Sequence, residues 1–363
     1  MKRRHFLQAA AAAPVLLQVP HWALAQQLPF DPKPGPWRSF EIVTRVEIAK
    51  PAGASKVWIP LPSVESDYQM PLGNDWTGNA SQAAVVSDGK YGAKMLMAEF
   101  KAGEAAPWVE VTSRFSTRDR VVDLRSRGEA KLSAEERAFY TAPTSLMPTD
   151  GIVRKTALEA TRGAKSELDK ARALYEWIVD NTFRDPKTVG CGRGDVKFML
   201  ESGNLSGKCA DLNALYVALA RSVGLPARDV YGVRVAKSQF GYRSLGAGTE
   251  NITRAQHCRA DVFVSGYGWV PVDPADVRKV VLEEKAQPTD LMDPVVPPVR
   301  ARLFGAWEMN WLAYNDAHDV KLPGSQGEPV AFFMYPQAET GGQRVNPYAP
   351  DDFRYKITAR PVS

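Results

Sequence analysis

Cys209 has the surroundings of a possible nucleophile. It stands in the stretch GKCADLNALYVALARSVGLPAR, residues 207–228, directly before residues with helical spacing. A thiol reacts as the thiolate, and the unpaired N–H groups and dipole of a helix N-terminus favour that anion. The amide of Cys209 would point out of the helix start, as a donor to an oxyanion should. The alternative is a small buried residue that begins a core helix, since free cysteine is often buried.

A cysteine nucleophile needs a base, and the base needs a group that orients it. Outside the N-terminal leader described below, the chain has two histidines, His257 and His318. His257 opens the strand-like segment HCRADVFV, and a turn at 265–268 sends the chain back through WVPVD to Asp273. In such a hairpin the carboxylate of Asp273 returns close to His257 and can fix its tautomer. Cys209, His257 and Asp273 are therefore the predicted catalytic residues.

Other cysteines and histidines offer alternatives. Cys191, in GCGRG, is a weaker nucleophile candidate, because glycines on both sides predict a loop. A Cys191–Cys258 disulfide would leave Cys209 as the odd thiol of an exported protein. A zinc site from Cys191, Cys209, His257 and Cys258 is the chemical rival, but these residues lack a paired C-x-x-C knuckle. His318, in NDAHDV, is predicted to be a surface or loop histidine.

Several further residues could border the site, and each also has a simpler structural interpretation. Trp269 could line the cleft or belong to the core. Arg193 and Asp195 lie in a glycine-rich segment and are more typical of ordinary loop charges. Arg228 follows the helix and is predicted to be structural, either in an ion pair or as a cap after the helix. Asp211 lies in the first helical turn, where a carboxylate suits the helix dipole.

The first 25 residues are typical of a secretory signal. A basic start is followed by a short apolar stretch and by Ala23-Leu24-Ala25, which has the form of a cleavage site. The pair Arg3-Arg4, followed by Phe-Leu, resembles a bacterial twin-arginine signal, and an ordinary secretory signal is the alternative. We therefore expect an exported, periplasmic protein.

Removal of this leader changes the charge of the chain. The leader carries three basic residues and no acidic one, so the net charge falls from +5 to +2. A nearly neutral chain gives no argument for a nucleic-acid partner. No later stretch is long and apolar enough to predict a membrane span.

The order of the patterns predicts two domains. Residues 26–37 are proline-rich and are predicted to be a linker. Over 38–128, short alternating segments separated by turn residues predict an antiparallel, sandwich-like β-domain. The catalytic domain is predicted over 129–363, with a C-terminal β extension. Its helices come first, starting with a capping box at Ser133 and Glu136, and strands follow. Helices segregated from an antiparallel sheet predict an α+β fold.

Local patterns also predict the elements around the candidate residues. Helices are expected over 168–183 and 209–223, the second with one apolar face towards the core. Strands are expected over 228–235, 257–264 and 269–273, and residues 287–300 are expected to be a proline-rich crossing.

The blocks GKCADLNALYVALARSVGLPAR and HCRADVFVSGYGWVPVDPADV together resemble the bacterial transglutaminase-like superfamily. The shared pattern is G-x-C at a helix start, a helix ending in G-[IL]-P-A-R, a strand with histidine, and G-W-x-x-[VF]-D-P. The resemblance covers about residues 130–340. In one departure, Cys258-Arg259 follows the histidine, where many members have an aromatic residue.

The resemblance implies a papain-like core and a cysteine-dependent reaction without cofactor or metal. Cys209 would be the nucleophile, His257 the general base and then acid, and Asp273 the orienting carboxylate. The implied reaction is acyl transfer through a thioester, with hydrolysis of a peptide or amide bond as the leading expectation. A protein or a peptidoglycan-derived peptide would be the substrate. Amine transfer that cross-links proteins, and a non-catalytic binding module, are the alternatives.

Overall fold

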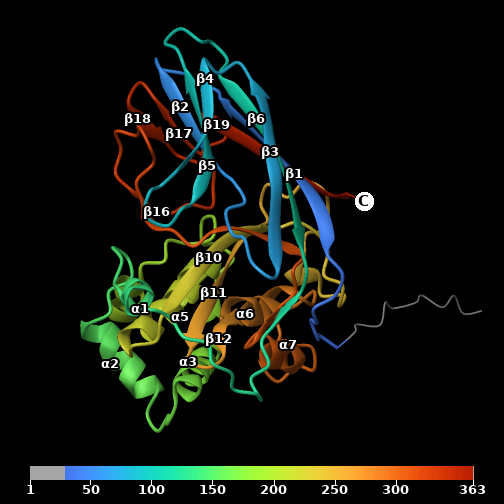
Figure 1. Cartoon of the computed structure of the whole chain (residues 1–363), viewed down its shortest axis with the longest axis vertical. Coiled ribbons are helices and arrows are strands. Elements are labelled where there is room, and N and C mark those ends of the chain that lie inside the picture. The colour runs from blue at the N-terminus through green and yellow to red at the C-terminus, as the bar shows by residue number, and fades with distance from the viewer. Residues whose placement is uncertain (1–28, 363) are drawn as a thin grey trace, which may run out of the picture.

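Two layered parts meet in the computed structural model, which describes residues 29–362 (Figure 1). A β-sandwich lies at one end of the molecule, and a part with mixed helices and strands lies at the other. The secretory signal predicted for residues 1–25 lies outside the described residues. Among those described, no helix combines the length and the apolar character needed to cross a bilayer.

The sandwich consists of two antiparallel sheets with strand orders β19-β1-β6-β3 and β18-β17-β2-β5-β4. Alternating apolar residues of both sheets, among them Val46, Val57, Leu96 and Val111, pack into one core between them. The strands are β1 (Arg38–Ile48), β2 (Ser55–Pro60), β3 (Gln69–Gly78), β4 (Gln82–Ser87), β5 (Lys94–Phe100), β6 (Trp108–Thr117), β17 (Gln337–Thr340), β18 (Gln343–Val345) and β19 (Phe353–Val362).

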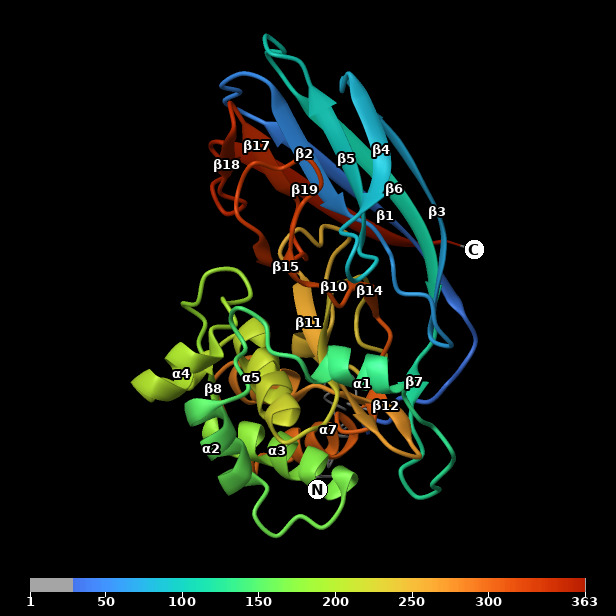
Figure 2. The ribbon, with the colours of Figure 1, turned by 60° about the vertical axis from the view of Figure 1, so that its left-hand side comes forward.

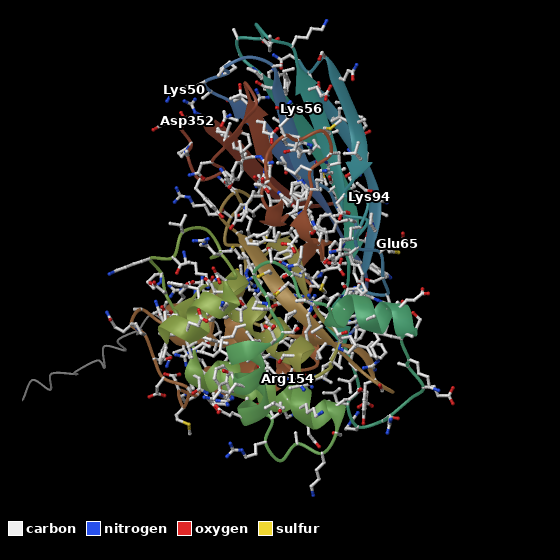
Figure 3. The ribbon with its side chains drawn as sticks, turned by 90° about the vertical axis from the view of Figure 1, so that its left-hand side faces the viewer. Lys50, Lys56, Glu65, Lys94, Arg154 and Asp352 are labelled. Carbon is white, nitrogen blue, oxygen red and sulfur yellow. The ribbon has the colours of Figure 1, made fainter. Side chains whose placement is uncertain are left out.

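The C-terminal strands complete this sandwich. Strand β19 pairs with β1 from Ser39–Val362 to Ile48–Phe353, and β17 pairs with β2. At the tip of the sandwich Lys50, just after β1, and Asp352, just before β19, form an ion pair of 2.7 Å (Figure 3). The predicted C-terminal extension therefore joins the N-terminal sheets, and its connecting loops reach the second part.

The second part is built on a sheet with the order β12-β11-β10-β14. Its strands are β10 (Ala227–Arg234), β11 (Gln256–Val264), β12 (Gly268–Val272) and β14 (Trp311–Asn315). The helices are α1 (Ala134–Thr141), α2 (Gly151–Ala160), α3 (Glu167–Asn181), α4 (Val196–Ser202), α5 (Cys209–Ser222), α6 (Pro274–Glu283) and α7 (Val296–Arg302). Short pairs complete it: β7 (Arg120–Val121) with β13 (Ala306–Trp307), β8 (Phe183–Arg184) with β9 (Ser206–Gly207), and β15 (His318–Val320) with β16 (Val330–Phe332). The predicted α+β fold is confirmed.

Helix α5 is the centre of this part. It lies against β11 and β10 on one side and against α2 and α3 on the other (Figure 2). All 14 of its residues are buried, so the prediction of a single apolar face was too narrow. The polar side chains of Asn213 and Arg221 donate instead to main-chain carbonyls, those of Cys258 and Ala227. Arg154 of α2 donates to the carbonyl of Ser222 and closes the C-terminal end of α5 (Figure 3).

Sequence patterns predicted some helices and missed others. The capping box of Ser133 and Glu136 starts α1, as predicted. Helices α2 and α6 were not predicted, although Asp273 followed by Pro274 is a favourable helix start. Helix α7 begins inside the segment 287–300 that was predicted to be only a crossing.

Candidate active site

Cys209 is the first residue of α5 and is 3% exposed. The preceding Lys208 has an extended backbone, so the chain enters the helix abruptly from β9. The first N–H groups of a helix have no carbonyl acceptor one turn earlier. The predicted helix start at Cys209 is therefore confirmed, and the amide of Cys209 has no acceptor within the helix.

His257 and Asp273 lie together at the same end of the sheet. Strand β11 carries His257 and pairs with β12, with Ala260 opposite Val272, so the chain returns to Asp273 beside the histidine. The distance from His257 Nε2 to Asp273 Oδ2 is 2.7 Å, and both side chains are buried. Because Asp273 occupies Nε2, the other ring nitrogen, Nδ1, is the one left open to another partner. The hairpin geometry predicted from the sequence is confirmed.

A second carboxylate, which the sequence did not predict, also faces the imidazole. Asp276 Oδ2 lies 3.4 Å from His257 Nε2, and its Oδ1 accepts from Arg234 at 2.5 Å. Burial and the nearby Arg234 guanidinium oppose protonation of His257, but the carboxylates of Asp276 and Asp273 outweigh them and raise its pKa to about 9. The imidazolium is therefore favoured at neutral pH.

Two further side chains fix the carboxylate of Asp273. Asn213 of α5 donates to Oδ1 at 3.4 Å and to the carbonyl of Cys258 at 2.8 Å. The guanidinium of Arg259 lies 3.5 Å from Oδ2 and stacks on Trp311, 4.7 Å from the ring centre. Arg259 is part of the departure from the family pattern that the sequence displayed. Its charge thus lies beside Asp273 and away from solvent.

Three thiols meet at the start of α5. Cys191, Cys209 and Cys258 are all free and buried, so the alternative Cys191–Cys258 disulfide is not formed. The neighbouring Cys191 and Cys258 thiols and His257 lower the pKa of Cys209 well below its usual range, although burial opposes the shift. The pKa values of Cys191 and Cys258 are raised well above theirs, that of Cys191 chiefly by the neighbouring Cys209 and that of Cys258 chiefly by burial. These directions favour the thiolate at Cys209 over the other two thiols.

Asp211 holds the loop that carries Cys191 against the helix start. Its carboxylate accepts from the amides of Lys208 at 2.9 Å, Arg193 at 2.9 Å and Gly194 at 3.0 Å. A Cβ on Gly192 would lie 1.8 Å from this carboxylate, and the φ of Gly192 is +97°. A glycine is therefore required there. The prediction that Asp211 serves the helix dipole is extended by this second role.

The remaining sequence candidates lie elsewhere or have structural roles. His318 is not a surface residue, as was predicted: it is buried, and its Nδ1 lies 3.2 Å from Tyr231 Oη. His318 lies on strand β15, and this strand pairs with β16. Arg228 forms ion pairs with Asp261 and Asp316, as expected of a structural arginine. Trp269 packs edge-to-face against Tyr140, away from the cleft that contains Cys209.

The loop charges and the zinc alternative can be placed in the same way. Asp195 caps α4 by accepting from Phe198 at 3.1 Å, and Arg193 contributes its main chain to the contact with Asp211. Within residues 29–362, the group of possible metal ligands whose atoms all lie within 4.8 Å of one another is His257, Asp273 and Asp276. It differs from the cysteine-rich set of the zinc alternative, and Arg234 already neutralises one of its carboxylates.

The candidate residues open into a cleft of about 690 Å³ between the two parts of the molecule. Cys209, His257 and Cys191 lie on the wall formed by the mixed part. Tyr348 and Tyr355, from the C-terminal segment, form the facing wall. The arrangement supplies a thiolate, an imidazolium held by two carboxylates, and a free amide at the sulfur. These groups suit attack on a carbonyl carbon with protonation of the departing group.

Residues 154–274, which contain all three predicted catalytic residues, match the family model of the transglutaminase-like superfamily. An uncharacterized protein of Haemophilus influenzae is 34% identical over 88% of this chain and 91% of its own length. The uncharacterized protein YebA of Bacillus subtilis is 22% identical over 63% of this chain, which spans 30% of that protein. The crystal structure of a candidate cysteine protease from Cytophaga hutchinsonii has a TM-score of 0.51 at 14% identity, over 90% of this chain and 99% of that one. This last similarity supports the fold.

Proposed function

Because the chain belongs to the transglutaminase-like superfamily, we propose that it is a cysteine-dependent acyl-transfer enzyme with Cys209 as its nucleophile. One observation carries the proposal. The thiol at the start of α5 shares a cleft with His257, whose Nε2 is already held by Asp273 at 2.7 Å. A buried thiol without a reaction to perform would need neither the oriented imidazole nor the lowered pKa.

The proposed reaction begins with attack of the Cys209 thiolate on the carbonyl carbon of an amide. The carbonyl oxygen becomes an oxyanion and accepts a hydrogen bond from the amide of Cys209. His257, as the imidazolium, then donates its Nδ1 proton to the departing amine, the C–N bond breaks, and a thioester remains. In the second half, the neutral imidazole takes a proton from water, the resulting hydroxide attacks the thioester, and the thiolate leaves with a carboxylic acid as product.

We propose water, and not a lysine side chain, as the usual acceptor. Cationic side chains line the cleft, among them Lys208 and Arg254, and none of the described lining residues is an aspartate or glutamate. A lysine ammonium would be repelled there, whereas water is not. Peptide or amide hydrolysis is therefore favoured over protein cross-linking.

We also propose that the protein is exported to the periplasm through the predicted twin-arginine signal. The test is a fusion of the full chain to a reporter, followed by fractionation. Replacing Arg3 and Arg4 together by lysine should hold the fusion in the cytoplasm, because a twin-arginine route requires the pair. Unchanged export would indicate an ordinary secretory signal instead.

Substrate profiling tests the enzymatic proposal. The mature protein is incubated with a peptide–amide library, with and without a primary amine, and products are identified by mass spectrometry. Hydrolysis gives carboxylic acids in both samples, whereas amine transfer gives amine adducts only in the second. Cys209→Ser should form no product, and the surface variant Lys94→Gln should behave as wild type. Turnover by Cys209→Ser equal to wild type would exclude the proposal, and a binding module would give peptide retention without product.

A further inference from the structure

We propose that this cleft selects acyl donors that carry a carboxylate close to the scissile amide, that is, acidic peptides. The inference rests on the proposed role of Cys209 as the nucleophile. Five cationic side chains from five separate segments line the cleft, and no acidic side chain lies among its described lining residues. The five are Arg184, Lys208, Arg234, Arg254 and Lys279.

Two of these cations are already paired inside the protein. Arg234 is buried and bonds Asp276 at 2.5 Å, and Arg184 forms an ion pair with Glu283. No ion pair of Lys208 or Arg254 is found within residues 29–362. Lys208 is half-buried and directly precedes Cys209, and Arg254 is exposed on the loop before β11. The positive charge at the rim of the cleft is therefore open to a ligand.

Positive charge also exceeds negative charge around Lys279, which lies deeper in the cleft. Its Nζ lies 3.7 Å from Glu283, which Arg184 already engages. Burial and the nearby Arg234 lower the pKa of Lys279 to about 8, although Asp276 and Glu283 act against this shift. Arg184, Arg234 and Lys279 thus share the carboxylates of Glu283 and Asp276, and Asp276 also faces His257. A bound carboxylate would complete the balance and stabilise the charged lysine.

Buried donors without partners lie beside these charges. The side-chain nitrogen of Gln256 and the hydroxyl of Tyr335 line the cleft, and neither has a hydrogen-bond partner within residues 29–362. Tyr335 is 5% exposed. A buried donor without a partner costs free energy in the empty protein, so a ligand oxygen that accepts from it gains affinity. Carbonyl and carboxylate oxygens of a peptide provide such acceptors.

The charge of the cleft can be tested without a known substrate by labelling Cys209 with two haloacetyl probes. Iodoacetate and iodoacetamide differ chiefly in one negative charge. The rate for each is measured at the Cys209 peptide by mass spectrometry, in the folded protein and in urea. The ratio of the iodoacetate rate to the iodoacetamide rate should be at least about tenfold higher in the folded protein. It should fall in high salt, which screens the cations.

Matched variants assign this ratio to the cleft. The double variant Lys208→Gln/Arg254→Gln should reduce the ratio by at least about threefold. Lys94→Gln, an exposed lysine on β5 (Figure 3), should leave it unchanged. A ratio equal to that of the unfolded chain, or unaltered in the double variant, would overturn the proposal.

Peptide binding to Cys209→Ala separates the possible sources of the carboxylate. Four fluorescent glutamine peptides are compared by anisotropy: three blocked at both ends and flanked by Glu, Gln or Lys, and one neutral with a free C-terminal carboxylate. If the Glu-flanked peptide binds at least about tenfold more tightly than the Gln-flanked one, the cleft recognises a side-chain carboxylate. If instead the peptide with the free C-terminal carboxylate binds more tightly, the cleft recognises a chain terminus. Equal binding of all four overturns the inference. Since this variant cannot turn over, these results are independent of whether the proposed reaction occurs.

Discussion

His257 Nε2 lies 2.7 Å from Asp273 Oδ2, and the other oxygen of the same carboxylate accepts the amide of Asp276 at 3.0 Å. One side chain therefore orients the imidazole and caps helix α6. The carboxylate cannot turn away from His257 without giving up the cap, which is typically worth about 1 kcal/mol. The position of the proposed general acid is thus fixed by the start of a helix.

The rate of the proposed reaction should depend on pH through His257 and Cys209. The thiolate is required for attack and the imidazolium for departure of the amine. Since the pKa of Cys209 is lowered and that of His257 is raised to about 9, kcat/KM should be flat near neutral pH and fall above about 9. A pH profile with an amide substrate checks this. A fall that begins near pH 6 to 7 would contradict the assignment of the carboxylates around His257.

Asp276→Asn should move the alkaline fall of this profile to lower pH. The variant removes a negative charge 3.4 Å from His257 and leaves Arg234, which opposes imidazolium formation. A downward shift of roughly one pH unit or more is expected. Asp276→Asn/Arg234→Met is the companion variant, because it removes the buried pair together and avoids an unpaired guanidinium. An unshifted profile in Asp276→Asn would show that Asp276 does not act on His257, whereas the double variant should fall at a higher pH than this single variant because it also removes the opposing charge of Arg234.

The sequence predicted those parts of the site that depend on local patterns. The helix start at Cys209 and the hairpin that brings Asp273 to His257 both follow from short motifs with turn residues. Asp276 and Arg234 were missed because each looks like an ordinary charge in its own segment, and only the tertiary packing brings them together. Pairing of β19 with β1 joins segments some 300 residues apart and leaves no local pattern. His318 was placed at the surface because of its acidic neighbours, whereas the structure buries its ring against Tyr91 and Tyr231.

Asp211→Ala should loosen the loop that holds Cys191. The variant loses three main-chain hydrogen bonds at the start of α5, and we expect a stability loss of about 1–2 kcal/mol. Iodoacetamide labelling of Cys191 in the folded protein should also become faster. Asp195→Ala removes the cap of α4 without touching Asp211 and is the matched control. Equal labelling of Cys191 in both variants would indicate that Asp211 does not hold the loop.

Asp229→Asn should stabilise the protein at alkaline pH. Neither carboxylate oxygen of Asp229 has a hydrogen-bond partner within the described residues, and burial raises its pKa from 3.8 to about 8. The folded protein therefore retains a proton that the unfolded chain releases, so this group reduces stability as pH rises from about 4 to about 8. Asparagine does not ionise, and a gain of roughly 1–3 kcal/mol at pH 8 is expected, with little gain near pH 4. Urea unfolding at both pH values measures the gain, and an equal effect at both would contradict the shifted pKa.

Cys191→Ala should raise the pKa of Cys209, because the neighbouring Cys191 thiol contributes most to lowering it. The pH at which Cys209 labelling by iodoacetamide is half-maximal should rise by roughly one unit. Cys191→Ser retains a hydrogen-bond donor at the same position and should shift this labelling pH less. The alanine and serine variants together therefore separate the loss of a donor from the loss of packing. Cys258→Ala should act in the same direction, since that thiol also lowers the pKa of Cys209. If alanine and serine at position 191 gave the same curve as wild type, His257 and the helix start would account for the thiolate without its neighbouring cysteines.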